Sequence, residues 1–205
     1  MYLQITTKCN MNCGHCGFSC TAQGENMSIA TFKRAVKLAN HYGDTISIGG
    51  GEPTVHPKFW DMLGWAITHT DCEDNKTWLA TNGKKTQDAI RLASLAKSGV
   101  ISCDLSQDPY HETIDERVIR AFNVRENDRL RDMGINDHRG VRNTSNSLIN
   151  AGRCDWGEDM CICEDIFVKP NGDIHQCGCA DSPKIGNVLT GISGDVEFGT
   201  CHTLF

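Results

Sequence analysis

The sequence predicts an α/β fold built on a parallel sheet. Short apolar or β-branched runs alternate with longer runs of helical spacing through about the first 125 residues, and this alternation is typical of βαβ units. The segments richest in cysteine, glycine and asparagine each follow one of the predicted strands. Because ligands collect at the carboxyl ends of parallel strands, this placement indicates one shared binding site.

The individual elements follow from periodicity and from capping residues. Strands are expected at residues 2–6, 45–48, 76–80 and 100–106. The first helix is expected to begin after Ser28, a typical N-cap residue, and to end at Gly43. Apolar side chains that recur every three or four positions predict further helices at residues 57–68, 86–98 and 116–124. Residues 127–150 are polar and only weakly periodic, so no element is assigned there.

The composition of the chain changes after Cys154. The segment IFVKPNGDIHQCGC, residues 166–179, predicts a β-hairpin that turns at residues 170–173. Cysteines bracket this hairpin on both sides. The chain is therefore expected to consist of a core at residues 1–150 and a small cysteine-rich extension at residues 151–205.

Composition limits the class of protein. Hydrophobic residues make up 39% of the 205 residues, as in soluble globular proteins. No apolar run approaches the roughly 20 residues that cross a bilayer, and the first residues do not resemble a signal peptide, so a cytoplasmic location with no membrane contact is expected. The net charge of −6 argues against general nucleic-acid binding. Twelve cysteines in a reducing compartment favour metal or cluster ligation over disulfides.

Three cysteines follow the first predicted strand at C-x3-C-x2-C spacing, namely Cys9, Cys13 and Cys16. Thiolates are the ligands that hold iron–sulfur clusters, and three of them leave one iron of a cubane cluster free for a further ligand. A zinc site is the alternative, because structural zinc takes four ligands and Cys20 or His15 could supply the fourth.

Two motifs then resemble a known family. The segment CNMNCGHC is similar to the signature of radical S-adenosylmethionine (SAM) enzymes, and GGGEPTVHP is similar to their Gly-Gly-Glu-Pro motif. The resemblance covers about residues 1–125 and implies a partial (β/α)6 barrel of the TIM type. One position departs from the pattern, since His15 stands where the family usually has an aromatic residue that packs near the adenine of SAM.

The resemblance also implies cofactors and site residues. Cys9, Cys13 and Cys16 would hold a [4Fe–4S] cluster whose open iron chelates SAM, and a reductant of flavodoxin or ferredoxin type would supply one electron. Cleavage of the C5′–S bond would then give a 5′-deoxyadenosyl radical that takes hydrogen from the substrate. Cofactor contacts are expected from His15, Gly50, Gly51, Glu52, Pro53, Asn82, Ser106 and Asp108. His111 is expected to act as an acid or base that faces the substrate, and a structural role is its alternative.

The second cysteine group resembles the SPASM extension of this family, or its shorter Twitch form. This resemblance implies an auxiliary iron–sulfur cluster on Cys161, Cys163, Cys177 and Cys179, with Cys201 in reserve. A structural zinc on the hairpin is the alternative. Cys72 and Cys103 are expected to be buried as small hydrophobic side chains.

The substrate is suggested by a cluster of positive charge. Residues 117–153 contain eight Arg, no Lys and four acidic residues, which favours an anionic partner because guanidinium groups match phosphate and carboxylate geometry. Candidate contacts are Arg129, Arg131, Arg139 and Arg142, unless the segment is simply a solvated surface. A nucleotide or a hypermodified phage-type DNA base is the leading substrate hypothesis. The alternatives are a peptide or protein maturase, a non-catalytic zinc protein and an electron-transfer protein with two clusters.

Overall fold

The structure is a computed structural model, and it describes residues 1–70, 77–123, 137–143, 148–157, 166–179 and 181–193. A nine-stranded sheet in the order β5-β4-β3-β2-β1-β6-β7-β8-β9 runs through it. Five neighbouring strands of this sheet pair in parallel and follow one another in chain order. They are β1 (Tyr2–Thr6), β2 (Ser47–Gly50), β3 (Trp78–Thr81), β4 (Ser102–Ser106) and β5 (Arg139–Arg142).

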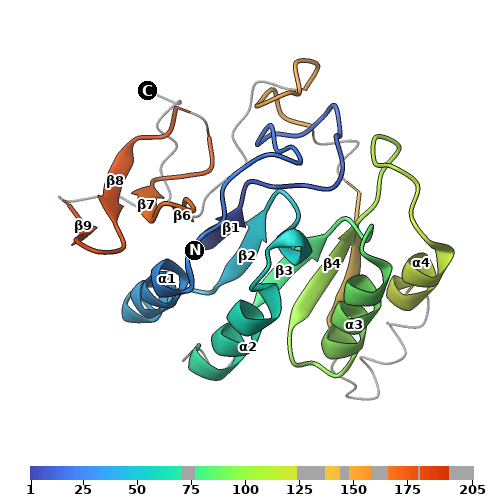
Figure 1. Cartoon of the computed structure of the whole chain (residues 1–205), viewed down its shortest axis with the longest axis horizontal. Coiled ribbons are helices and arrows are strands. Elements are labelled where there is room, and N and C mark those ends of the chain that lie inside the picture. Colours follow the sequence, from blue (N-terminus) through green and yellow to red (C-terminus); the bar gives the residue numbers. More distant parts are fainter. Residues whose placement is uncertain (71–76, 124–136, 144–147, 158–165, 180, 194–205) are drawn as a thin grey trace.

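Four helices lie along one face of this parallel sheet (Figure 1). They are α1 (Ile29–His41), α2 (Phe59–His69), α3 (Thr86–Lys97) and α4 (Glu116–Phe122). Strand side chains alternate between the two faces. On β3, for example, Leu79 is buried in the core that the helices cover, whereas Trp78 and Ala80 are half-buried on the other face. One hydrophobic core therefore fills the space between the sheet and the helices, and the opposite face is left for a ligand.

The α/β class and the parallel sheet are confirmed, with element ends that differ by a few residues. Strand β2 extends into the glycines, to Gly50, and α2 starts at Phe59 because a short 3₁₀ turn, η1 (Pro53–Val55), precedes it. Strand β5 lies in the segment to which no element was assigned. Its sequence is polar because it is the edge strand of the sheet.

The C-terminal segment continues the same sheet on the other side of β1. Strand β6 (Phe167–Val168) pairs in parallel with β1. Strands β7 (Asp173–His175), β8 (Lys184–Asn187) and β9 (Gly191–Ile192) then follow in antiparallel order. The turn between β6 and β7 is closed by hydrogen bonds between Lys169 and Gly172 or Asp173, with Gly172 at a φ of 87°. The division at residues 150 and 151 stays a prediction.

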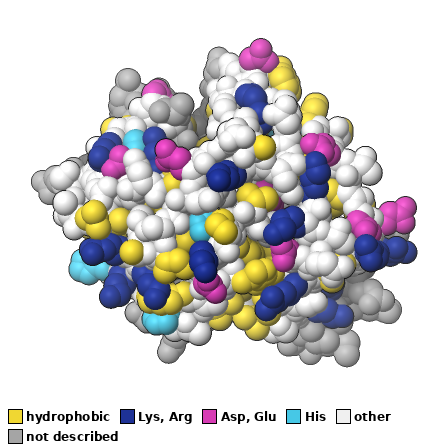
Figure 2. All heavy atoms as spheres, in the orientation of Figure 1, with side chains coloured by type: hydrophobic (Ala, Val, Ile, Leu, Met, Phe, Trp, Pro, Cys, Tyr) yellow, Lys and Arg dark blue, Asp and Glu magenta, His cyan; other side chains and the backbone are white. Residues whose placement is uncertain are grey.

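Surface charge is mixed on the face that Figure 2 shows. Lys and Arg side chains are spread over it with acidic side chains between them. None of the helices in the described part of the chain is both long and apolar enough to cross a membrane.

Candidate active site

A cavity of about 490 Å³ lies at the carboxyl ends of the parallel strands. It is bounded by the loop after β1, the glycine turn after β2, and the ends of β3, β4 and β5. The sequence motifs predicted to share a site therefore meet there. The predicted residues that line it are Cys9, Cys13, His15, Cys16, Gly50, Gly51, Glu52, Pro53, Asn82, Ser106, His111, Arg142 and Cys179.

The three cysteines of the first motif are half-buried free thiols on the loop that follows β1. The backbone N–H of Met11 points to Cys9 Sγ at 3.4 Å, and the N–H of Cys20 points to Cys16 Sγ at 3.4 Å. Such donors stabilise negative charge on sulfur. Three thiols that line one cavity, with N–H donors behind two of them, fit the ligand set of a three-cysteine iron–sulfur cluster.

The thiols differ in acidity. Hydrogen bonding from the Cys20 thiol, together with backbone N–H donors and despite burial, lowers the pKa of Cys16 to about 5. The same contact raises the pKa of Cys20. Burial and the neighbouring Cys9 raise the pKa of Cys13 to about 11. Cys20 is itself buried, and it contacts the candidate ligand Cys16 through its backbone N–H, whereas its thiol donates to Phe18 O at 3.8 Å.

The glycine turn is packed closely against the loop that carries the cysteines. Gly51 N–H donates to Thr6 O and Glu52 N–H donates to Lys8 O, both at 2.9 Å. A Cβ atom at Gly50 would collide with the carbonyl oxygen of Thr6, and one at Gly51 with that of Lys8. Gly50 also has a φ of 147°, which L side chains rarely adopt. These positions therefore require glycine, and they leave bare backbone at the cavity wall.

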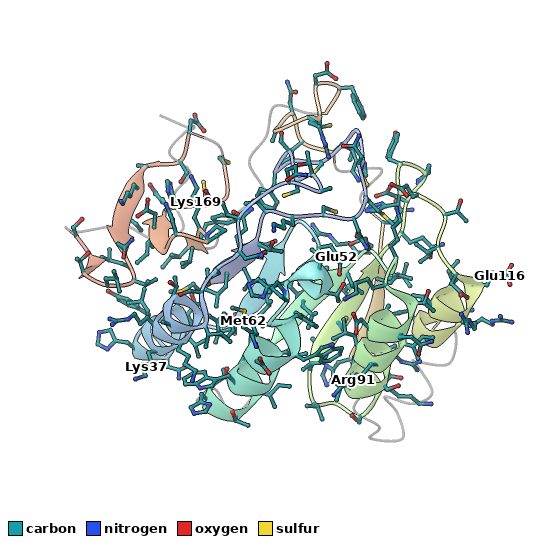
Figure 3. All side chains as sticks on the ribbon, in the orientation of Figure 1. Lys37, Glu52, Met62, Arg91, Glu116 and Lys169 are labelled. Carbon is teal, nitrogen blue, oxygen red and sulfur yellow. The ribbon has the colours of Figure 1, made fainter. Side chains whose placement is uncertain are left out.

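Glu52, labelled in Figure 3, is 1% exposed and lies at the strand ends. One carboxylate oxygen accepts hydrogen bonds from Thr54 Oγ1 at 2.6 Å and from Thr81 Oγ1 at 2.9 Å. The other accepts from the N–H of Asn82 at 2.8 Å. Burial raises the pKa of Glu52, and these donors oppose the rise. Glu52 thus joins the end of β2 to the end of β3, and its predicted contact with the SAM ammonium stays a proposal.

Asn82 braces the cysteine loop. Its side-chain amide donates to Asn10 Oδ1 at 2.9 Å and approaches Cys9 Sγ at 3.7 Å. Its side-chain oxygen, Oδ1, accepts from the backbone N–H of Lys84 at 3.0 Å. Asn10 was not predicted as a site residue, since its only signal in the sequence is its position next to Cys9.

His15, Asp108 and His111 form a cluster at the edge of the cavity. Asp108 Oδ1 lies 2.8 Å from His111 Nδ1, and Asp108 Oδ2 lies 3.4 Å from His15 Nε2. The two rings meet edge to face with centroids 4.9 Å apart. Burial lowers the pKa of His15, and the charge of Asp108 opposes this. The cavity lining includes both histidines but not Asp108, so Asp108 orients the imidazoles from behind.

The predicted anion-binding arginines that the structure describes, Arg139 and Arg142, differ in their contacts. Arg139 forms a two-pronged ion pair with Asp137, at 2.6 Å from Nη2 and 3.0 Å from Nε, and also donates to Ala121 O. Its predicted substrate role stays a prediction, and in the structure this guanidinium is engaged by Asp137 and by the backbone of α4. Arg142, three residues on along β5, lines the cavity. Arg129 and Arg131 lie outside the described residues.

The second cysteine group is partly described. Cys177 is buried, Cys179 is half-buried and lines the cavity, and Cys154 is buried at the edge of the cysteine loop. Cys161, Cys163, Cys201 and Cys72 lie outside the described residues. Cys103 is buried in β4, as predicted.

Comparison with known families assigns the chain. Residues 3–146 match the model of the Radical SAM superfamily, so the chain belongs to this superfamily. Its members use a [4Fe–4S] cluster and SAM, and the three thiols beside the glycine turn fit those groups.

The individual proteins to which the chain is similar share only a small part of its sequence. The chain is 26% identical over 121 residues to the mycofactocin maturase MftC of Mycobacterium ulcerans. The aligned region covers 56% of this chain and 30% of that protein. It thus matches about a third of the length of this curated relative. Its fold is similar to that of BtrN in complex with AdoMet and 2-DOIA, with a TM-score of 0.64, 16% identity, and coverage of 92% of this chain and 77% of that chain. A structure of anSMEcpe with AdoMet and the Cp18Cys peptide gives a TM-score of 0.55, 14% identity, and coverage of 91% and 76%.

Proposed function

We propose that this chain binds a [4Fe–4S] cluster and SAM in the cavity and carries out a radical reaction on a peptide or protein substrate. The observation that carries the proposal is the convergence of three thiols, the glycine turn and polar strand ends on one cavity of about 490 Å³. When bound, the cluster and SAM supply a 5′-deoxyadenosyl radical that takes hydrogen from the substrate. The protein supplies position and electrostatics.

Different residues around the cavity are proposed to bind the cluster, to support the cysteine loop and to contact SAM. Cys9, Cys13 and Cys16 would hold the cluster, and Asn82 would fix the loop that carries them. The bare backbone at Gly50 and Gly51 would let the methionyl part of SAM approach closely. The ring of His15 would pack near the adenine, and Ser106 at the end of β4 would contact the ribose.

His111 is proposed to move a proton to or from the substrate. Its ring lines the cavity, and the carboxylate of Asp108 lies 2.8 Å from its Nδ1. A carboxylate in that position would orient the imidazole. The other ring nitrogen is then left for the substrate.

A peptide or protein substrate has better support than a nucleotide or DNA base. A relative of this chain is named a maturase, and the solved structure of anSMEcpe contains a peptide. In contrast, Arg139 is engaged inside the fold, and Arg142 is the only Lys or Arg among the described residues that line the cavity. A polyanion usually meets several cationic side chains.

The C-terminal cysteines are proposed to hold a second cluster. Cys177 and Cys179 come from the segment after β7, and Cys179 reaches the same cavity as the first motif. Cys161 and Cys163 would complete the ligand set. A flavodoxin- or ferredoxin-type protein is proposed as the external one-electron reductant.

The test is anaerobic reconstitution with iron and sulfide, followed by incubation with SAM and dithionite. We expect about eight irons per chain, four for each cubane cluster, and formation of 5′-deoxyadenosine. Cys13→Ala should lose about four irons together with SAM cleavage. Cys103→Ala is the matched control, because that cysteine is buried in β4 away from the cavity lining, and it should keep both.

Other outcomes would change the assignment. About four irons that disappear in Cys13→Ala would leave the C-terminal cysteines to zinc or to packing. Zinc without SAM cleavage in the wild-type chain would overturn the proposed function.

A further inference from the structure

The end of the cysteine loop is held by a turn from the segment that follows β5. The N–H of Cys154 donates to Ala151 O at 3.0 Å and closes this turn. Within the turn, the N–H of Arg153 donates to Cys16 O, also at 3.0 Å. Gly152 has a φ of 61°, and a Cβ atom there would collide with the carbonyl oxygen of Cys16. The turn therefore lies directly against a candidate cluster ligand.

The side chain of Arg153 spans the same loop. Its Nη2 donates to Cys20 O at 2.8 Å, and its Nη1 donates to the side-chain oxygen of Asn12. Asn12 immediately precedes Cys13 in the sequence, and the N–H of Cys20 points to Cys16 Sγ at 3.4 Å. One guanidinium thus joins the two ends of the segment that carries the second and third cysteines of the motif.

Arg153 brings a positive charge to this loop, and the described residues supply no carboxylate within ion-pair distance of it. Its guanidinium contacts two neutral oxygen atoms, and its Nε is buried with no hydrogen-bond partner in the described part of the chain. Lys84 also donates to the loop, at Asn10 O, but it pairs with Glu112. A buried donor without a partner is costly, so this arrangement favours an anionic group beside Arg153. The anionic group that the loop would provide is the set of cluster thiolates.

We propose that Arg153 is a positioning residue for the cluster, which holds the cysteine loop in place and stabilises the reduced form of the cluster by its charge. This inference rests on the proposed function, because it concerns the cluster that this function requires. It gives a role to a residue outside residues 3–146, the part that matches the superfamily model.

The direction of the effect follows from charge. Reduction of the site by one electron from the external donor adds one negative charge to a group that three thiolates already hold. A nearby cation therefore stabilises the reduced form more than the oxidised form, and net charge is one of the factors that set cluster potentials. Arg153 is not among the residues that line the cavity, so it acts on the cluster ligands rather than on SAM or the substrate.

The test is a redox titration of the reconstituted full chain, in which electron paramagnetic resonance follows the fraction of reduced cluster. The signal that changes when SAM is added belongs to the cluster of the first motif. At a fixed solution potential, Arg153→Gln should lower the ratio of reduced to oxidised cluster about tenfold, which for one electron is a shift of about 59 mV to more negative potential. Arg153→Lys keeps the charge and should restore most of the ratio. Arg120→Gln is the matched control, since Arg120 is exposed on α4, and its potential should equal that of the wild type.

Hydrogen exchange in the cluster-free chain is a second readout, and it does not require the cluster. We expect Arg153→Gln to speed amide exchange in residues 12–20 about threefold or more, because the side-chain hydrogen bonds to Asn12 and Cys20 are lost. Exchange in α1 to α4 should not change. If Arg153→Gln binds no iron, this measurement decides, and exchange of the loop at the wild-type rate would overturn the proposal.

SAM cleavage by the wild-type chain is measured on the same preparation, so that the two proposals fail separately. If SAM is cleaved but Arg153→Gln has the potential of the wild type, the role of Arg153 is wrong and the proposed function stands. If Arg153→Gln shifts the potential and Arg153→Lys restores it, but the wild type does not cleave SAM, the role of Arg153 stands and the radical reaction is wrong.

Discussion

Gly50 and Gly64 differ in what an added methyl group would meet. Gly50 has a φ of 147° and faces the carbonyl of Thr6, whereas Gly64 lies in α2 with open space at its Cβ position. We expect Gly50→Ala to lower the free energy of unfolding by about 2 kcal/mol or more through backbone strain. Gly64→Ala should raise it by roughly 0.5–1 kcal/mol, because alanine favours a helix interior.

Urea unfolding under anaerobic, reducing conditions measures both changes. If Gly50→Ala were as stable as the wild type, β2 would not approach the cysteine loop as closely as the structure shows. Gly64→Ala is the control in the same experiment, because it shows whether replacing a glycine by alanine lowers the free energy of unfolding where the new methyl group has open space.

At the level of single residues, motifs were predictable and their partners were not. The sequence indicated Cys9 and Glu52 by spacing, and both line the cavity. It did not indicate that Glu52 would bind Thr81 and the N–H of Asn82, or that Asn82 would bind Asn10. Those contacts join residues 29 to 72 positions apart, and only the register of the sheet brings them together.

Among the elements, the edge strand β5 depends on an ion pair between its first residue, Arg139, and Asp137, which lies just before the strand. Asp137 and Arg139 are 2% and 12% exposed, and Arg139 also reaches Ala121 at the end of α4. Burial opposes the charge of Asp137, but hydrogen bonds from Arg139 outweigh it and lower the pKa of Asp137. We expect Asp137→Asn to lower the free energy of unfolding by about 2 kcal/mol at pH 7, because hydrogen bonds to a charged group are lost.

The pH dependence of this loss follows from the lowered pKa. Ionised Asp137 stabilises the fold above its unfolded pKa of about 3.9, and this contribution is lost as the pH falls through the lower folded pKa. The difference between wild type and Asp137→Asn should therefore shrink in acid, as measured by urea unfolding from pH 7 to pH 3. Asp115→Asn is the control, since Asp115 pairs with Arg117 at the same spacing but on the surface. It should change stability little at any pH.

The same strand shows why prediction of elements from the sequence was incomplete. Strands β1 to β4 alternate or concentrate apolar residues because the helices cover them, and their positions were predicted within a few residues. Strand β5 is an edge strand with the sequence RGVR, half-buried or exposed throughout, so it carries no hydrophobic signal. Gly140 packs against Asp104, Arg139 pairs with Asp137, and Arg142 lines the cavity. None of these contacts can be read from the sequence.

At the scale of the whole molecule, the C-terminal segment and the core share one sheet. Phe167 and Val168 of β6 pair with Tyr2 and Leu3 of β1, and Val168 is fully buried in the core that the helices cover. A division at residues 150 and 151 therefore does not imply two units that unfold separately. The pairing of β6 with β1 should couple them.

Val168→Ala tests this coupling. Loss of two buried methyl groups should lower the free energy of unfolding by about 1–3 kcal/mol. Because β6 and β1 belong to one sheet, we expect a single urea transition whose midpoint shifts equally by far-UV circular dichroism and by tryptophan fluorescence. Three of the four tryptophans, Trp60, Trp65 and Trp78, lie in the part of the chain that contains α2 and β3, so most of the tryptophan fluorescence follows the core. If Val168→Ala split the transition in two and left the fluorescence midpoint unchanged, the C-terminal strands would be an independent unit that only rests against β1.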